Sequence, residues 1–315
     1  MMNIALSTDH NYIMPAGVMI CSVCVNHPNC DIEFHVICNN DVTESDKNDL
    51  RRIVDEYRKT IVFYKIDFPV PDCFSVGKEG QPKHITLASY YRFFLPQLLP
   101  DSTDRVLYLD TDLIVRHSLV DMYYSDMDSV GLLAVPNNQE GNILHYNRLR
   151  YPSHLGYFNA GVLLINLSYW RDNDSYNQAV EYATQNPEKL KFHDQDILNY
   201  IFRQAKKNLP LKYNLQYDFF LKEPRISYVY EKELEEAIKD PVIIHYNIKD
   251  KPWRKKCKHP YKDEFLKYRG FTKWAKEPLW PALPVTWRKK IRNVLIWLKI
   301  LKKPFNPYKS ITPLI

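Results

Sequence analysis

The sequence predicts an α/β fold built on a mainly parallel, Rossmann-like sheet. In the first hundred residues, short apolar segments of strand length alternate with segments of helical periodicity, which is the pattern of successive βαβ units. The chain has 315 residues, of which 45% are hydrophobic and 25% are charged. That balance is typical of a globular enzyme with a sizeable core. We therefore expect one main domain with a smaller additional segment.

Strands are expected where apolar residues form short runs, and helices where apolar residues recur three or four positions apart. In the first half the expected strands are 4–7, 32–38, 61–66 and 105–109. The helices between them are 15–26, a polar helix that begins at Thr43, and 86–98, which ends before Pro100. In the second half we expect strands at 130–135, 158–167 and 241–246, and helices at 170–186 and 194–205.

The positive charge of the chain is concentrated at its C-terminal end. The formal net charge is +6, from 43 Lys and Arg against 37 Asp and Glu. Residues 286–315 carry eight basic residues and no acidic one, which leaves the remainder of the chain at −2. A near-neutral body lacks the broad basic face of a nucleic-acid-binding fold, so no nucleic-acid partner is expected.

Residues 286–303 have the pattern of an amphipathic helix with a basic face. Apolar residues recur at helical spacing between the cations, at Ile291, Val294, Leu295, Leu298 and Leu301. Trp287 and Trp297 are expected to act as aromatic anchors. We expect this helix to bind an anionic membrane surface, where each cation contributes on the order of 1 kcal/mol. The alternative is a helix that packs on the body and leaves its basic face in water.

The first residues, Met1–Ser7, lack the basic start of a secretory signal. The longest apolar run of the first half, 18–25, is also far shorter than the ~20 residues of a membrane span. Together with the basic C-terminal segment, these features predict a cytoplasmic protein that is peripheral on the inner face of the cell membrane.

An acidic pair follows the strand expected at 105–109. Asp110 and Asp112 form one of four Asp-x-Asp triplets, and theirs alone is flanked on both sides by apolar strand residues. Ligands of open α/β sheets bind at the carboxyl ends of strands. Two carboxylates there repel each other unless a hard divalent cation neutralises them. His245, at the end of the strand at 241–246, is the best-placed third ligand, although it is also compatible with a hydrogen-bonded core histidine.

Five ordered segments resemble the family 8 glycosyltransferases, particularly the bacterial lipopolysaccharide α-galactosyltransferases and α-glucosyltransferases. The segments are 9–12, 107–112, 158–166, 194–199 and 245–253, and the resemblance covers about residues 3–255. It implies a GT-A fold, a UDP-galactose or UDP-glucose donor, a Mn²⁺ cofactor with Mg²⁺ as the alternative, and transfer with retained anomeric configuration. The expected division is a catalytic domain at 1–255, an irregular Pro/Trp-rich wrap at 256–285 and the basic membrane-association tail at 286–315.

The resemblance also implies roles for individual residues. The metal ligands would be Asp110, Asp112 and His245, and Lys251 would contact the diphosphate. The uridine pocket would be formed by Ser7, Asp9, Asn11 and Tyr12, which without the other motifs would be assigned to a polar turn. The donor sugar would be bound by Arg92, Asp110, Asn159 and Asp194, with Thr111 and Ala160 also assigned to the donor. Taken alone, Arg92 fits a surface or helix-capping cation, and Asp194 fits a helix cap.

Gln195 would lie on the reacting face of the anomeric carbon, beside Asp194. Because an amide is a poor nucleophile, we expect front-face substitution through an oxocarbenium-like transition state, stabilised by the Gln195 carbonyl oxygen. His84, Phe192 and His193 resemble acceptor-side residues, and the acceptor would be a saccharide, on a lipid or a surface glycan such as lipopolysaccharide.

Two positions depart from the family pattern. Ile248 stands where relatives usually have glycine in the His-to-Lys loop, and Pro136-Asn137-Asn138 replaces a segment that often carries an aspartate. These departures keep open a catalytically degenerate nucleotide-sugar-binding protein. A glycogenin-like enzyme that glucosylates itself is a further alternative, since it shares the fold and the metal motif, but it does not predict the basic tail. The intact acidic pair and Lys251 favour catalysis.

Overall fold

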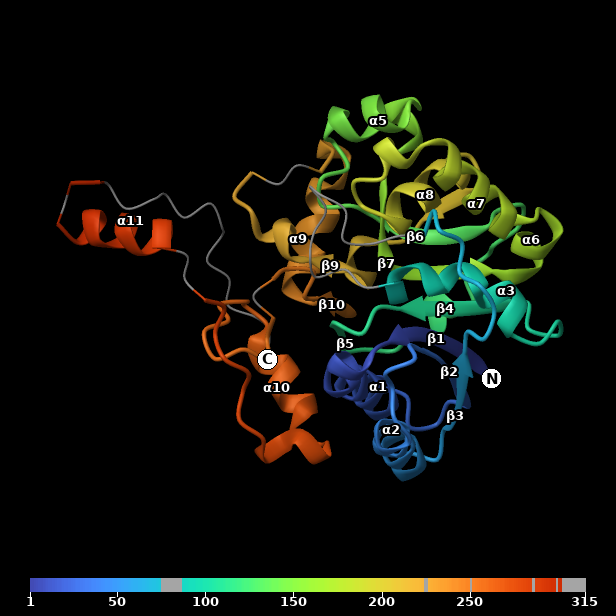
Figure 1. Ribbon diagram of the computed structural model, residues 1–315, viewed down its shortest axis with the longest axis horizontal. Helices are drawn as coiled ribbons and strands as arrows, with labels where there is room; N and C mark the ends of the chain where they lie inside the picture. The colour runs from blue at the N-terminus through green and yellow to red at the C-terminus, as the bar shows by residue number, and fades with distance from the viewer. Residues whose placement is uncertain (75–86, 224–225, 250, 285–286, 299, 302–315) are drawn as a thin grey trace.

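The computed structural model describes residues 1–74, 87–223, 226–249, 251–284, 287–298 and 300–301. A seven-stranded sheet runs through the body in the order β3-β2-β1-β4-β7-β6-β8. Figure 1 shows the strands from β3 to β6 in this order. Strand β7 is antiparallel to both neighbours, and every other neighbouring pair is parallel. The strands are β1 (Met2–Thr8), β2 (Ile32–Cys38), β3 (Thr60–Lys65), β4 (Arg105–Leu109), β6 (Leu132–Pro136), β7 (Phe158–Asn166) and β8 (Lys206–Asn208). The expected α/β class and its parallel-rich sheet are confirmed.

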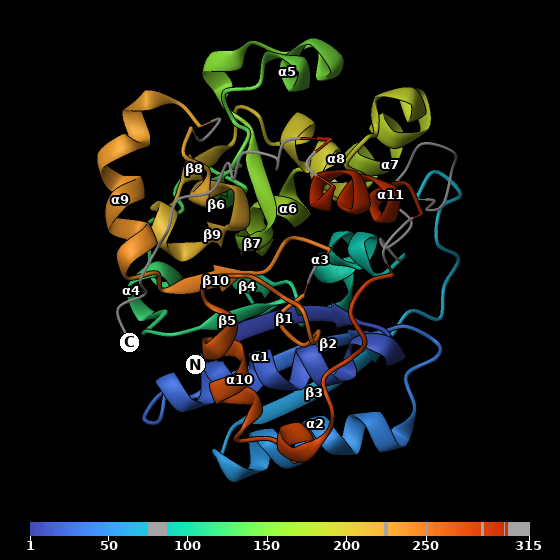
Figure 2. The same ribbon diagram turned by 90° about the vertical axis from the view of Figure 1, so that its left-hand side faces the viewer.

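Hydrophobic side chains on the two faces of this sheet form separate cores, because successive strand residues point to opposite faces. On β4, Leu107 and Leu109 belong to the core that contains α1 (Ile13–Asn26) and α2 (Glu44–Glu56). Val106 and Tyr108 belong to the core on the other face. There α6 (Leu167–Asp172), α7 (Ser175–Gln185) and α8 (Asp194–Ile201) cover the sheet, as the view in Figure 2 shows.

The polar helix α2 begins where the sequence predicts, whereas α1 begins at Ile13, before the expected start at residue 15. Thr43 caps α2 through a reciprocal box with Asp46, in which the Thr43 hydroxyl accepts from the Asp46 N–H and the Asp46 carboxylate accepts from the Thr43 N–H. The expected helix at 86–98 differs in its described part. Leu87–Phe94 is a 3₁₀ helix (η2), and only Leu95–Leu98 (α3) is α-helical. Pro96 lacks the N–H that a continuous α-helix needs.

Two helices of the second half are shorter than expected. The segment 170–186 divides into α6 and α7 at Asp174, which has a left-handed backbone with φ of 48°. Helix α8 ends at Ile201, and the chain reaches strand β8 five residues later. That short edge strand was not predicted, because a helix was expected to continue to residue 205.

A second sheet of three strands lies beside the end of β4. Its order is β5-β10-β9, formed by β5 (Leu113–Val115), β10 (Ile243–His245) and β9 (Leu215–Gln216). Strand β10 is antiparallel to β5, with His245 opposite Leu113. The Tyr246 N–H also donates to the Asp112 carbonyl at 2.9 Å. This sheet therefore brings the end of β10 next to the acidic pair.

The remaining helices are α4 (Val120–Tyr123), α5 (Ile143–Leu149), α9 (Glu231–Lys239), α10 (Lys262–Arg269) and α11 (Trp287–Trp297). Helix α10 lies in the segment expected to be irregular. Its residues Phe265 and Tyr268 are buried in the core with α1, and so is Trp274 after it. The expected wrap is thus packed against the body.

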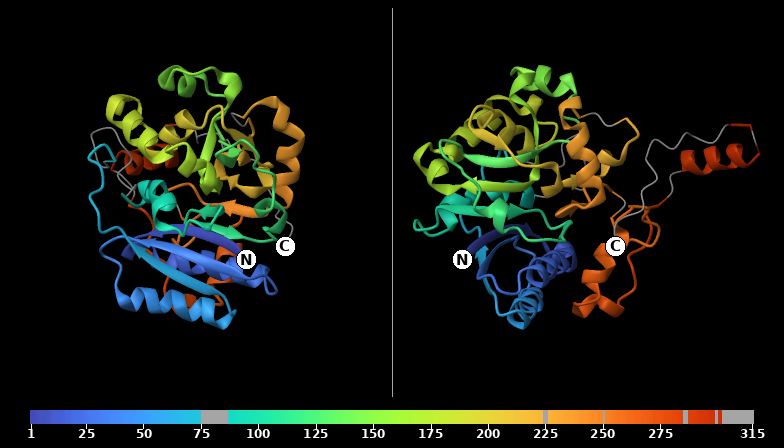
Figure 3. Two further views of the ribbon diagram at one scale, coloured as in Figure 1. Left: turned by 90° about the vertical axis from the view of Figure 1, so that its right-hand side faces the viewer. Right: turned by 180° about the vertical axis from the view of Figure 1, so that it is seen from behind.

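Helix α11 stands away from the sheet and its covering helices in Figures 1 and 3. Several of its apolar side chains are exposed, including Trp287 at 66% and Trp297 at 79%. Within the described chain, no helix is long and apolar enough to cross a bilayer. The expected cations Lys302 and Lys303 lie outside the described residues.

We predict that Gly17→Ala destabilises the protein by about 1–3 kcal/mol, although alanine is normally better than glycine within a helix. A Cβ at position 17 would lie 2.4 Å from Cζ3 of Trp274. Urea unfolding measures the change. The same substitution in a Trp274→Leu background should cost less, and an equal cost in both backgrounds would contradict the proposed packing.

Candidate active site

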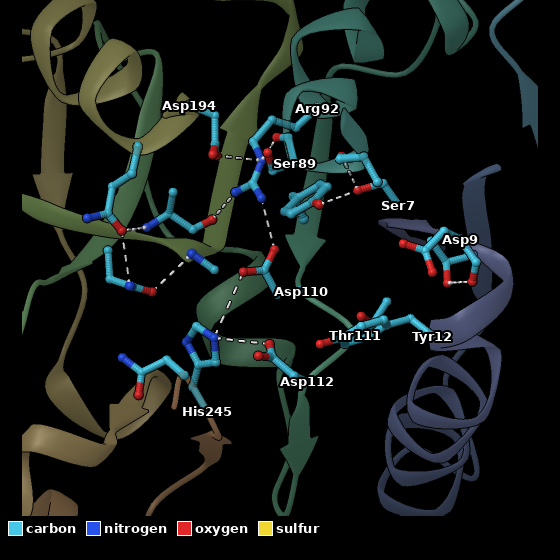
Figure 4. Close-up of a pocket in the computed structure, with 18 of the residues that line it drawn as sticks. Ser7, Asp9, Tyr12, Ser89, Arg92, Asp110, Thr111, Asp112, Asp194 and His245 are labelled. Carbon is cyan, nitrogen blue, oxygen red and sulfur yellow. Dashed lines mark hydrogen bonds and ion pairs between the residues drawn. The ribbon is translucent and has the colours of Figure 1, made fainter. Parts of the chain in front are cut away.

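A pocket of about 270 Å³ opens at the carboxyl ends of β1 and β4 and the start of β7 (Figure 4). Most of the expected site residues line it: Ser7, Asp9, Tyr12, Arg92, Asp110, Thr111, Asp112, Asn159, Ala160, Phe192, Asp194, Gln195, His245 and Lys251. Asn11 is exposed and does not line this pocket, and His193 is fully buried beneath it. His84 lies outside the described residues. Residues far apart in sequence are thus collected at one place.

Asp110, Asp112 and His245 form a cluster whose ligand atoms all lie within 4.8 Å of one another. His245 Nε2 is 3.2 Å from Asp112 Oδ1 and 3.9 Å from Asp110 Oδ2. The Lys251 ammonium contacts the other oxygen of Asp112. Burial alone would raise the pKa of the Asp112 carboxyl, but Lys251 and His245 hold it well below its usual range.

The residues present fit a divalent cation. Two carboxylates and one imidazole are ligands that Mn²⁺ accepts, and carboxylates with water suit Mg²⁺. Space for the cluster depends on Gly161, because a Cβ there would lie 2.3 Å from His245 Cε1 and 2.9 Å from Asp110 Oδ2. The absence of a side chain on β7 therefore allows the imidazole and carboxylate to approach.

Arg92 is a buried cation between two carboxylates. Its guanidinium contacts Asp110 at 2.9 Å and Asp194 at 3.2 Å, and it also donates to the Ala160 carbonyl. The guanidinium carbon lies 4.2 Å from the centre of the Tyr108 ring. With only 3% of its surface exposed, Arg92 is not a surface cation. Burial raises the pKa of Asp194 to about 6, against the opposing effect of Arg92.

Gln195, in the first turn of α8, has both ends of its amide bound. Its carbonyl oxygen accepts from Asn159 Nδ2 and from the Ala160 N–H, each at 3.1 Å. Its NH₂ group donates to the Tyr157 hydroxyl at 3.0 Å. That hydroxyl donates in turn to Asp196 Oδ1 at 2.8 Å. The amide is therefore held in one orientation.

Asp196 and His193 anchor the start of α8 from below the pocket. Arg148 binds the fully buried Asp196 carboxylate through two nitrogens, at 2.6 and 2.8 Å. His193 has a backbone φ of 52° with ψ of −125°, a strained conformation for a residue with a side chain. Its Nδ1 lies 3.2 Å from the Tyr90 hydroxyl. Asp196 therefore has a structural role as well as a helix-terminal position.

The expected uridine residues divide into two groups. Ser7 is engaged within the protein, since its hydroxyl donates to the Ala88 carbonyl and lies 2.7 Å from the Tyr108 hydroxyl. Asp9 and Tyr12 line the pocket, and the Tyr12 ring contacts Trp253 edge-on with centroids 6.0 Å apart. Tyr12 and Asp9 are therefore the better placed to meet a ligand.

The two departures from the family pattern leave the pocket intact. Ile248 is not among the described residues with positive φ, so glycine is not required there. Its N–H donates to the Tyr246 carbonyl at 2.8 Å. After β6, Gln216 secures the loop by accepting from the Asn138 N–H and donating to the Pro136 carbonyl. Neither Ile248 nor this loop lines the pocket.

Sequence reasoning missed several residues of the site. Ser89, Tyr108 and Asn247 line the pocket, and Asn214 lies behind it. Tyr108 lies within an apolar strand whose side chains are expected to be buried in the core, and Asn214 belongs to no motif. Only Asn247 carried a signal, because it lies between His245 and Lys251.

We predict that Gly161→Ala weakens Mn²⁺ binding by at least ~10-fold, because the new Cβ displaces His245 or Asp110 from the cluster. Titration calorimetry with the metal measures the affinity. Gly17→Ala is the control: it is destabilised by a clash in the core with α1 and should bind Mn²⁺ normally. Equal affinities of Gly161→Ala and the wild type would argue against a cation at this place.

Comparisons with known proteins agree with this geometry. The model of the family "Glycosyl transferase family 8" matches residues 3–257. General stress protein A of Bacillus subtilis is 27% identical, covering 87% of this chain and 94% of the relative. The lipopolysaccharide 1,3-galactosyltransferase of Salmonella typhimurium is 29% identical, covering 87% and 79%.

A solved structure of the galactosyltransferase LgtC, in complex with donor and acceptor sugar analogues, superposes with a TM-score of 0.76. It is 27% identical, and the match covers 92% of this chain and all of that one. The parallel-rich sheet with its reversed strand β7 is thus a GT-A fold. The family match, which spans most of the chain, and the pocket at the strand ends lead to one conclusion: this chain belongs to glycosyltransferase family 8 and is an enzyme of that family.

Proposed function

We propose that the protein is a retaining, metal-dependent hexosyltransferase that moves galactose or glucose from a UDP-sugar to a saccharide acceptor. The observation that carries the proposal is the Asp110–Asp112–His245 cluster beside two buried cations, Arg92 and Lys251, in one pocket. Relatives named as lipopolysaccharide galactosyl- and glucosyltransferases support the hexose and a lipid-linked or surface-glycan acceptor.

In this proposal Asp110, Asp112 and His245 hold Mn²⁺, with Mg²⁺ as the alternative. The cation would supply positive charge for the diphosphate leaving group. Lys251 contacts Asp112, so its ammonium already lies at the edge of the cluster and can turn to a phosphate oxygen. His245 and Lys251 together provide fixed positive or polar groups where negative charge develops.

The donor would lie along the pocket from β1 to α8. We assign uracil to Tyr12 and Asp9, whereas the Ser7 hydroxyl is bound to the Ala88 carbonyl and the Tyr108 hydroxyl. Asn11, exposed at the neighbouring turn, is left without a direct role. The sugar hydroxyls would meet a second group that lies around β7 and α8: Arg92, Asp110, Thr111, Asn159, Ala160 and Asp194.

Catalysis would proceed by front-face substitution through an oxocarbenium-like transition state. Gln195 Oε1 already accepts two hydrogen bonds, which lowers the availability of its electrons for a covalent bond. The oxygen retains its partial negative charge, which can stabilise a cationic sugar. Asp194, whose pKa is raised by burial to about 6, would bind a sugar hydroxyl beside it. The departing phosphate would accept the proton of the acceptor hydroxyl.

Acceptor binding would involve the outer side of the pocket, where Phe192 lies. His193 is completely buried, and its Nδ1 is hydrogen-bonded to the Tyr90 hydroxyl. We therefore assign it a role in shaping the start of α8 and not in contacting the acceptor.

We further propose that α11 attaches the enzyme to the cytoplasmic face of an anionic membrane, beside its acceptor. Support comes from the exposed apolar side chains of the helix, among them Trp287, Ile291, Val294 and Trp297. Arg288, Lys289 and Lys290 lie in the same helix and supply cations.

Removal of residues 285–315 should abolish co-sedimentation with vesicles that contain phosphatidylglycerol, while leaving donor hydrolysis in solution unchanged. Vesicles of neutral phosphatidylcholine are the control, and the full chain should bind them much more weakly because the electrostatic contribution is absent. Unchanged sedimentation of the truncated protein would defeat the membrane proposal.

The central test measures UDP release with UDP-galactose and UDP-glucose in parallel, each with Mn²⁺ and with EDTA. We expect metal-dependent release from one donor. Asp112→Asn should lower the rate at least ~100-fold, because charge stabilisation by a metal is worth several kcal/mol. Asp128→Asn, in an exposed Asp-x-Asp triplet, is the matched control and should retain full activity.

Absence of release from both donors, together with metal-dependent UDP binding, would contradict transfer of these sugars and favour a binding protein. A mass increase of the enzyme itself would favour self-glycosylation.

A further inference from the structure

We propose that Asn214 is a positioning residue that holds the His245 imidazole as the Nδ1–H tautomer and thereby presents its Nε2 lone pair to the metal cluster. The inference rests on the proposed cation site and assigns a function to a residue outside the pocket. Asn214 is fully buried between the 3₁₀ helix Leu211–Tyr213 (η5) and strand β9.

The side chain of Asn214 joins two parts of the site. Its Nδ2 donates to Asn159 Oδ1 at 2.8 Å, and its Oδ1 lies 3.0 Å from His245 Nδ1. Strand β9 runs parallel to β10, with Leu215 opposite Ile244, so the backbone fixes Asn214 beside the histidine. Asn214 therefore lies behind the metal cluster, where it can orient a ligand without binding the cation.

The direction of these hydrogen bonds follows from a backbone group. The Gly161 N–H can only donate, and it lies 3.0 Å from Asn159 Oδ1, which identifies that atom as the carbonyl oxygen. The Asn214 atom that contacts the same oxygen must then be its NH₂ group. Consequently the other amide atom of Asn214, which faces His245, is an oxygen.

An oxygen that accepts from His245 requires a proton on Nδ1. The Nε2 atom, 3.2 Å from Asp112 and 3.9 Å from Asp110, then directs its lone pair to the space that these carboxylates share. A metal ligand needs this tautomer, and its outer hydrogen bond commonly fixes it. Without the Asn214 acceptor, the neutral His245 ring is more stable with its proton on Nε2, where it can donate a hydrogen bond to Asp112.

The hydrogen bonds from Asn214 through Asn159 continue to Gln195, on the side of the pocket where the sugar would react. Asn159 uses its NH₂ group for the Gln195 carbonyl, which the Ala160 N–H also contacts. The metal ligand and Gln195 are thus joined through Asn214 and Asn159, and a disturbance at Asn214 is transmitted in both directions.

The test compares Asn214→Leu, which removes the amide at similar volume, with Asn214→Asp, which keeps an acceptor for His245. The control is Asn26→Leu. Asn26 is half-buried, and its NH₂ group donates to the Ser22 carbonyl, the Val115 carbonyl and the Tyr268 hydroxyl, away from the cluster. Two quantities are measured: the ring protonation of His245 in metal-free protein, by long-range ¹H–¹⁵N spectra, and the Mn²⁺ affinity, by titration calorimetry.

We expect the wild type, Asn214→Asp and Asn26→Leu to carry the proton on Nδ1, and Asn214→Leu to carry it on Nε2. Mn²⁺ should bind Asn214→Leu at least ~10-fold more weakly than the wild type. It should bind Asn214→Asp more tightly than Asn214→Leu, because the aspartate keeps the acceptor for His245 although it loses the donor to Asn159 Oδ1. If Asn214→Leu does not fold, retained Nδ1 protonation in Asn214→Asp supports the proposal.

Wild-type tautomer and affinity in Asn214→Leu would overturn the inference, and so would loss of the Nδ1 proton in Asn214→Asp. A wild-type protein that binds no Mn²⁺ would instead defeat the proposed metal site. The tautomer is read in metal-free protein, so it separates the two failures.

Discussion

Repulsion among the carboxylates of one pocket is the constraint that determines how the site is arranged. Among the described residues that line the pocket, four are aspartates, and only Arg92 and Lys251 are permanent cations. Each of these cations is bound to an aspartate, Arg92 to both Asp110 and Asp194. With all four carboxylates ionised, these six side chains carry a net charge of −2, and a divalent cation neutralises that excess. The low pKa of the Asp112 carboxyl indicates that the local field favours its charged form.

The small sheet β5-β10-β9 connects this constraint to the chain fold. The acidic pair follows β4, whereas His245 and Lys251 come more than a hundred residues later. Antiparallel pairing of β10 with β5 places His245 opposite the residue that follows Asp112. Parallel pairing with β9 places Asn214 behind the imidazole. The second half of the chain thus completes a site that begins in the first.

The sequence predicts those parts of the structure that have local causes. Apolar periodicity located the main strands and most helices, and the position of Asp110 after an apolar strand identified the pocket edge. It did not predict the 3₁₀ helix at Leu87–Phe94 or the small sheet, because both depend on contacts with distant segments. Asn214 was missed for the same reason: its importance lies in two hydrogen bonds across the fold, and no neighbour in sequence indicates them.

The reversed strand β7 explains why rigid N–H donors are available at this edge of the sheet. Parallel strands bring their carboxyl ends to the pocket, as β1 and β4 do. Because β7 is antiparallel to β4, it begins at that same edge, and the Gly161 carbonyl accepts from the Asp110 N–H at 2.9 Å. The N–H groups of Ala160 and Gly161 contact side-chain oxygens of Gln195 and Asn159. Backbone groups cannot exchange donor for acceptor as a side-chain amide can by rotation. The direction of strand β7 therefore determines which atoms donate and which accept in the row of hydrogen bonds that joins Gln195 to His245.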